Sequence, residues 1–201
     1  MKRTVVMWMF VASMVMTLAS CSKNASSFDD LVAARRSVRS YDPNKKISEN
    51  EVRTLIATAQ EAPSWANVQA TRYYAVMSEE KLQEVKAAML NNQKTVSDVP
   101  VLIVTTYKRD QSGFFSGEAA NEVGNGWGAF DTGLGNAFLV LKAKEMGFDT
   151  VIMGLRDADA LRNILSIPGD EIIMSVVALG YGNQVPRRPE RKAQNEILYI
   201  K

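Results

Sequence analysis

The chain has 201 residues, of which 46% are apolar and 23% charged, with no histidine and a single cysteine. This length and composition are typical of one globular domain with a substantial core. Ser-His-Asp catalysis, Cys-His catalysis and the usual zinc sites are excluded, because all of them need imidazole or several thiolates. If the protein is an enzyme, its chemistry must come from a cofactor or from carboxylates, lysine or tyrosine.

The first twenty residues have the layout of a secretory signal peptide, with Lys2 and Arg3 before an uncharged, largely apolar run. That run ends in LASC, residues 18–21, which resembles the lipobox of bacterial lipoproteins, whose cysteine is lipidated. We therefore expect a signal peptide over 1–20, a lipidated tether over 21–27 with the lipid on Cys21, and a domain over 28–201. The protein would then be exported and lipid-anchored to a membrane of the cell envelope. The alternative is a plain signal peptide with an incidental cysteine.

The charge balance of the mature chain follows from this expectation. Without Lys2 and Arg3, 22 cationic side chains face 22 anionic ones. A neutral chain gives no electrostatic reason to expect a nucleic-acid partner.

Helical and strand patterns alternate from Phe28 onward. Ser48 and Glu51 form a capping box before an apolar-periodic run that Pro63 ends. Residues 99–107 are apolar almost throughout, as in a strand buried on both faces. The expected helices are 28–36, 48–62, 79–90, 130–148 and 157–167, and the expected strands are 71–78, 99–107, 149–155, 171–182 and 196–201. Residues 109–128, rich in Gly, Ser and Asn, are expected to form a loop or lid. The alternation predicts one α/β or α+β domain.

Phosphate-binding loops of the common types are absent from the sequence. There is no G-x-x-x-x-G-K-[ST] run, and the segments 124–129 and 133–138 each lack the final glycine of G-x-G-x-x-G. A bound phosphate would therefore need side chains to supply most of the positive charge.

Arginines and serines are concentrated directly after the first expected helix, in ARRSVRSYD, residues 34–42. Several guanidinium groups can hold a phosphate dianion by charge-assisted hydrogen bonds. The alternative is a solvated helix end whose cations favour the C-terminal dipole.

Three stretches in order, the first running from residue 35 to residue 76, resemble the nitroreductase family of FMN-dependent NAD(P)H oxidoreductases. They are RRSVRSYDPNKKISENEVRTLIATAQEAPSWANVQATRYYAV (35–76), which contains APSWANVQATRYY (62–74), then FDTGLGNAFLVLKAKEMGFDTVIMG (130–154) and ALGYGNQVPRRPERK (178–192). The resemblance implies an α+β fold of three layers, with a mixed β-sheet flanked by helices, a long central helix and a C-terminal strand extension. It also implies a homodimer with FMN at the subunit interface.

The resemblance also assigns cofactor-binding residues. Arg35, Ser37 and Arg39 would contact the FMN phosphate, with Arg36 between them. The remaining assignments are Arg188 and Arg191 beside the phosphate; Pro63, Ser64, Asn67 and Gln69 beside the isoalloxazine; Asn91, with Asn92 nearly equivalent; and Ile152, Met153 and Gly154, where a backbone N–H would face flavin N5.

This chain departs from the family pattern in one segment. Ala70-Thr71 replaces the usual Pro-Trp, and Trp65 replaces a small residue, which changes the expected shape of the substrate face. Phe114, Phe115 and Trp127 would either border the flavin or, as we expect, belong to the core or the dimer interface.

The activity implied is ping-pong transfer of electrons from NAD(P)H through FMN to a small-molecule acceptor such as a nitroaromatic or a quinone. An exported lipoprotein would not normally meet NAD(P)H, so another electron donor remains open. The alternative from another class is a lipid-anchored flavin- or ligand-binding protein without reductase activity.

Overall fold

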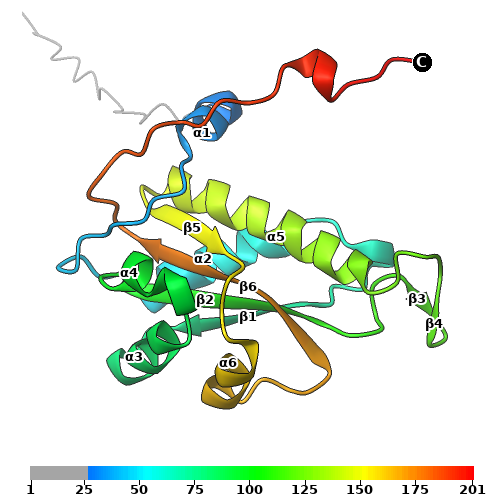
Figure 1. Ribbon diagram of the computed structural model, residues 1–201, viewed down its shortest axis with the longest axis horizontal. Helices are drawn as coiled ribbons and strands as arrows, with labels where there is room; N and C mark the ends of the chain where they lie inside the picture. The colour runs from blue at the N-terminus through cyan, green and yellow to red at the C-terminus, as the bar shows by residue number, and fades with distance from the viewer. Residues whose placement is uncertain (1–26) are drawn as a thin grey trace, which may run out of the picture.

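The computed structural model describes residues 27–201 (Figure 1). The expected signal peptide, Cys21 and all but the last residue of the tether lie outside this range. Within the range, no helix combines the length and the hydropathy needed to cross a bilayer.

A four-stranded sheet forms the centre of the domain, with the strand order β1-β2-β6-β5. Its members are β1 (Thr71–Val76), β2 (Val101–Lys108), β6 (Glu171–Gly180) and β5 (Asp149–Met153). All three pairings between these strands are antiparallel. A parallel bridge between Ser37 and Thr150 adds a further segment at the β5 edge, so the sheet is mixed, as expected.

Helices cover both faces of the sheet, which gives three layers (Figure 1). The helices α2 (Glu49–Gln60) and α5 (Gly126–Glu145) pack on one face, and α3 (Glu79–Ala87), α4 (Gln93–Val96) and α6 (Ala158–Leu165) pack on the other. A short α1 (Phe28–Ala34) precedes them. The predicted α+β fold is confirmed.

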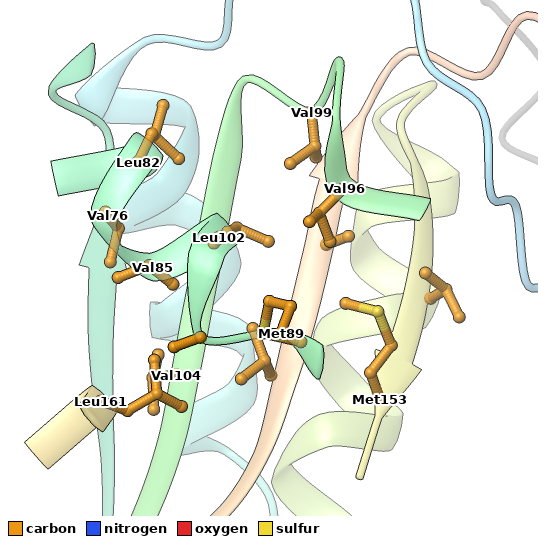
Figure 2. Close-up of a cluster of buried hydrophobic side chains, with 14 of the residues drawn as sticks. Val76, Leu82, Val85, Met89, Val96, Val99, Leu102, Val104, Met153 and Leu161 are labelled. Carbon is orange, nitrogen blue, oxygen red and sulfur yellow. The ribbon is translucent and has the colours of Figure 1, made fainter. Parts of the chain in front are cut away.

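Alternation along the two central strands explains why both faces are covered. In β2, Ile103 faces α2 and α5, whereas Leu102 and Val104 face α3 and α6. In β6, Val177 faces α2 and α5, whereas Val176 faces α3 and α6. Figure 2 shows the hydrophobic core on the α3 and α6 face of the sheet, where side chains of these helices and of the strands meet. Successive side chains of a strand point to opposite faces of the sheet, so strands with apolar residues at consecutive positions need a covering layer of helices on each face.

The helix boundaries follow from caps that the sequence encodes. Ser48 and Glu51 make the predicted capping box at the start of α2. Helix α5 begins four residues earlier than expected, at Gly126, and ends at Glu145, where Gly147 adopts a φ of 84°. A Cβ on Gly128 would lie 2.3 Å from the Tyr107 ring, so the absence of a side chain lets α5 approach β2 closely.

Two segments differ from the sequence expectation. The loop expected over 109–128 contains a short hairpin, β3 (Phe114–Phe115) and β4 (Glu118–Ala119). The strand predicted over 196–201 does not form within the single chain. Glu196 belongs to a 3₁₀ turn, Gln194–Glu196, and the residues after it have no strand partner in the described chain and lie at the end of an extended tail. Their apolar side chains, including Ile197 and Ile200, are exposed.

Candidate functional site

The arginine-rich segment is held as an added edge of the sheet. It leaves α1 at Arg35, the C-cap residue, whose N–H still donates to Leu31. Ser37 then forms its bridge to Thr150, and the Val38 N–H donates to the Thr150 carbonyl at 3.0 Å. These bonds fix the backbone that carries Arg35, Arg36 and Arg39, so the three side chains extend from one rigid segment.

The chain that leaves β6 returns to this segment. The Asp42 N–H donates to the Tyr181 carbonyl at 2.8 Å, and the Asn183 N–H donates to the Ser40 carbonyl at 3.2 Å. The tail that follows closes a cavity of about 230 Å³ against the segment. The lining residues are Arg35, Arg36, Ser37, Arg39, Pro186, Arg187, Arg188, Pro189 and Arg191. We call this the arginine pocket.

Charge in the arginine pocket is almost entirely positive. Six of its nine lining residues are arginines. The Glu190 carboxylate pairs with Arg187 at 3.6 Å, with both side chains largely exposed. The Arg36 guanidinium donates to two backbone carbonyls, those of Ala33 and Arg35, at the end of α1. Arg39 and Arg191 each make one longer hydrogen bond, to the carbonyls of Ser37 and Pro189 at 3.2 and 3.5 Å. The remaining guanidinium groups form a donor set suited to a phosphate dianion.

A line of predicted residues continues from the arginine pocket along β5. Four residues of strand separate Thr150 from Gly154, which is about 13 Å. Ile152 and Gly154 are exposed, while Met153 is buried, with its side chain in the core between the sheet and α3 and α6 (Figure 2). At the far end, Asn92 donates to the Leu155 carbonyl at 2.7 Å.

Asn91 is exposed beside that contact, in the 3₁₀ turn Leu90–Asn92. The Asn92 side-chain amide is thus used in a hydrogen bond to the backbone, so Asn91 is the more available of the two predicted amides for a ligand. Together with the arginine pocket and β5, it forms a continuous strip on one edge of the sheet.

The predicted turn over 63–69 forms a different site. Pro63, Ser64 and Gln69 line a second cavity, of about 410 Å³, which also includes Tyr73 and Asp131. The Ser64 hydroxyl accepts the Gln69 N–H at 3.0 Å, and the Gln69 amide donates to the Asn67 side chain at 3.1 Å. Burial raises the pKa of the Tyr73 hydroxyl to about 12, so this side chain stays protonated well above neutral pH.

These two groups of predicted residues do not meet within one chain. The turn precedes β1 at one edge of the sheet, and the arginine pocket adjoins β5 at the other. Asp131 contacts the turn near one end of α5, and Lys144 pairs with Asp149 near the other. The thirteen residue steps from Asp131 to Lys144 span about 20 Å of helix. Figure 1 shows the same separation, with the segment after α1 and the segment after α2 at opposite ends of α5.

Two residues of these sites were not predicted. Arg187 was passed over although it lies in the same basic run as Arg188. Asp131 is buried and accepts hydrogen bonds from Trp65 and Ser112. Its signal in the sequence is that it carries the only charge between Glu122 and Lys142.

Comparisons with known proteins relate this chain to one family. A family model described as "Nitroreductase family" matches residues 32–181. The candidate NAD(P)H nitroreductase MhqN of Bacillus subtilis (strain 168) is 26% identical over 202 residues, which cover 86% of this chain and 98% of that protein. Protein DrgA of Synechocystis sp. is 25% identical over 173 residues, covering 75% and 82%.

Solved structures share the fold at lower sequence identity. A candidate nitroreductase of Exiguobacterium sibiricum, solved in complex with FMN, has a TM-score of 0.79 and 22% identity, covering 88% of this chain and 98% of its own. A nitroreductase family protein of Streptococcus pneumoniae has a TM-score of 0.78 and 21% identity, covering 87% and 100%.

Proposed function

Because the chain belongs to the nitroreductase family, we propose that it is an FMN-dependent oxidoreductase that passes electrons from a reduced nicotinamide, or another donor, to a nitroaromatic, quinone or similar acceptor. The observation that supports this most strongly is the arginine pocket. Two segments about 150 residues apart in sequence bring six arginines and Ser37 around one cavity. A solvated helix end would not need the tail to return to it.

The residues present fit FMN by the chemistry of their donors. Arg35, Ser37 and Arg39 would hold the phosphate, with Arg188 and Arg191 contributing from the tail. Ile152, Gly154 and Asn91 line the strip that leads away from the pocket along β5, where backbone N–H and amide groups can read the edge of a flavin ring. Arg36 would contribute charge while its hydrogen bonds remain with α1.

FMN, when bound, supplies the redox chemistry, accepting hydride from the donor in one half-reaction and reducing the acceptor in the next. The protein needs no acid–base residue for this, which agrees with a chain without histidine. The role of the chain's own residues is to bind the phosphate, orient the ring and shape the space for the acceptor.

The proposed active unit is a homodimer. The turn over 63–69 and the β5 strip occupy opposite edges of one sheet, so a second copy must supply the turn if one flavin is to contact both. The exposed face of α5 supports this arrangement, because the large apolar side chain of Phe138 is 38% exposed on it. The apolar tail residues Ile197 and Ile200 offer further surface for a second copy.

We expect a protein that begins at Ser27 to purify yellow, or to bind one FMN per chain when FMN is added. Quenching of FMN fluorescence and the absorbance spectrum of the bound flavin measure this directly. Steady-state oxidation of NADH or NADPH with a quinone acceptor then separates a reductase from a flavin-binding protein without turnover. A colourless protein that leaves FMN fluorescence unchanged would contradict the proposed cofactor.

We also propose that the full-length protein is anchored by lipid on Cys21, an expectation that rests on residues 1–27 of the sequence alone. Replacing Cys21 by Ser should prevent labelling by radioactive or alkyne-tagged palmitate, and should leave a precursor that keeps its signal segment. Multiple acyl chains anchor stably because each buried methylene contributes about 0.8 kcal/mol.

A wild-type protein that retains Met1 by mass spectrometry, with no fatty-acid label, would contradict the anchor. It would also remove the conflict over the electron donor, since a protein in the cytoplasm meets NAD(P)H directly. Ser20→Ala, beside the cysteine, is a control that keeps both the thiol and a small residue before it, so palmitate labelling should be unchanged.

A further inference from the structure

A buried carboxylate connects two segments that are distant in sequence. The Asp131 side chain is on α5 and is 4% exposed. Both of its oxygens lie 3.1 Å from the Trp65 N–H, and one accepts the Ser112 hydroxyl at 2.7 Å. Within residues 27–201 it has no cationic partner, so two neutral donors hold the group.

The turn that Asp131 holds has an unfavourable backbone conformation. Ala66, Asn67 and Gln69 have φ values of 42°, 57° and 54°, in the left-handed region that non-glycine residues seldom adopt. Such a conformation persists where surrounding contacts determine it. The hydrogen bonds from Trp65 to Asp131 attach the start of this turn to the rigid helix α5.

The second segment that Asp131 holds carries another aromatic residue. Ser112 lies three residues before Phe115, and the next residue, Gly113, packs so closely on Trp127 that a Cβ there would lie 2.5 Å from the indole. The Trp65 ring centroid lies 5.9 Å from that of Phe115 and 4.6 Å from that of Trp127.

These rings form one connected group, which we call the aromatic wall. Its members are Trp65, Phe115, Trp127 and Phe130, the last with its ring centroid 5.7 Å from that of Trp127. Phe115 and Phe130 are 61% and 56% exposed, so part of the wall is open to a planar molecule. Trp65 stands directly after Ser64 of the predicted flavin-contacting turn.

We infer that Asp131 is a positioning residue that fixes the aromatic wall, and that a planar acceptor stacks on this wall. The inference rests on the proposed function, because it takes the 63–69 turn to border the flavin. One carboxylate anchors both the turn with Trp65 and the hairpin with Phe115, so its loss lets the two rings separate. Offset or edge-on contacts between rings depend on their mutual placement, and the acceptor would lose its binding surface.

Asp131→Asn tests this with a side chain of the same shape, in which one acceptor oxygen becomes a donor. With 2-methyl-1,4-naphthoquinone as acceptor, we expect KM to rise by about five- to twentyfold, while kcat changes by less than about twofold. The dissociation constant of FMN should rise much less than KM, since the arginine pocket that would hold the phosphate is unaltered and only the ring contacts of the turn are loosened. The near-UV circular dichroism from the Trp65–Trp127 contact should weaken, with or without acceptor.

Ser112→Ala removes only the hairpin anchor and leaves the Trp65 hydrogen bonds, so it should produce a smaller rise in KM and remains informative if Asp131→Asn does not fold. Glu171→Gln is the matched control. Glu171 is also a buried carboxylate that accepts from hydroxyl groups, those of Tyr74 and Thr106, and it has no contact with the wall. It should change thermal stability while leaving KM and the near-UV signal unchanged.

The outcomes separate this inference from the proposed function. If the wild-type protein binds FMN and reduces the quinone, but both Asp131→Asn and Ser112→Ala keep its KM and its near-UV signal, the positioning role is wrong. If the wild-type protein binds no FMN, the proposed function fails, and the near-UV signal of the variants still shows whether Asp131 holds the wall. A fall in kcat equal to the fall in kcat/KM, with KM unchanged, would also overturn the inference.

Discussion

Replacing Arg35 or Arg39 by Ala should weaken FMN binding by about 1.5–3 kcal/mol, or about 10- to 150-fold, the range measured for hydrogen bonds to charged groups. Both side chains line the arginine pocket. Neither forms an ion pair among residues 27–201, so each is available to a phosphate. Fluorescence titration of the FMN-free protein gives the dissociation constants.

Titration with riboflavin, which lacks the phosphate, shows whether the loss of FMN affinity comes from the phosphate contacts. Its affinity should be nearly the same for the wild type and for both variants, whereas the affinity for FMN should fall. Arg53→Ala is the control protein, because Arg53 pairs with Glu49 on α2 and is 73% exposed, away from the pocket. Equal loss of FMN and riboflavin affinity would mean that the substitution disturbs the fold and that the phosphate is bound elsewhere.

Phe138→Asp should convert the proposed dimer into a monomer. Phe138 lies on the exposed face of α5, and burial of such a side chain contributes about 2–3 kcal/mol. In a symmetric interface each substitution occurs twice, so we expect the dimer dissociation constant to rise by about a thousandfold or more. Light scattering after size-exclusion chromatography, or sedimentation equilibrium, measures the mass.

The same variant should also lose FMN affinity, because the partner's turn would no longer reach the β5 strip. Met174→Asp provides a control on β6 with nearly the same exposure, 39%, and should leave the mass at two chains. A wild-type protein that is monomeric with FMN bound would contradict the dimer. A Phe138→Asp dimer would show that α5 does not form the interface.

Most of the fold could be predicted because local signals agreed with the tertiary structure. The capping box at Ser48 set the start of α2, and the continuous apolar run of β2 marked a strand covered on both faces. Helix α5 was placed too late because Gly126 and Gly128, poor helix formers, obscured its first turn. The hairpin at Phe114 was missed because strands of two residues are too short to show a period.

The candidate site was predicted less completely, and for a different reason. The resemblance indicated Arg39 and Arg188, and the structure places both at one cavity. It did not indicate Asp131, since a single acidic residue in an apolar helix gives no information about which distant donors will meet it. The C-terminal strand was expected from the apolar run Ile197–Ile200 and from the resemblance, but a strand needs a neighbouring strand, and sequence pattern alone does not supply one.

The order of strands has a consequence for how the protein folds. The last strand in sequence, β6, lies between β2 and β5, and β5 pairs with β6 as its one neighbour among the named strands. A growing chain that has not reached residue 171 can form only the β1-β2 pair, which by itself is marginal. The backbone after β6 also closes the arginine pocket, through Tyr181 and Asn183. Completion of the sheet and assembly of the arginine pocket both require the chain beyond residue 170, so a chain truncated before β6 has neither.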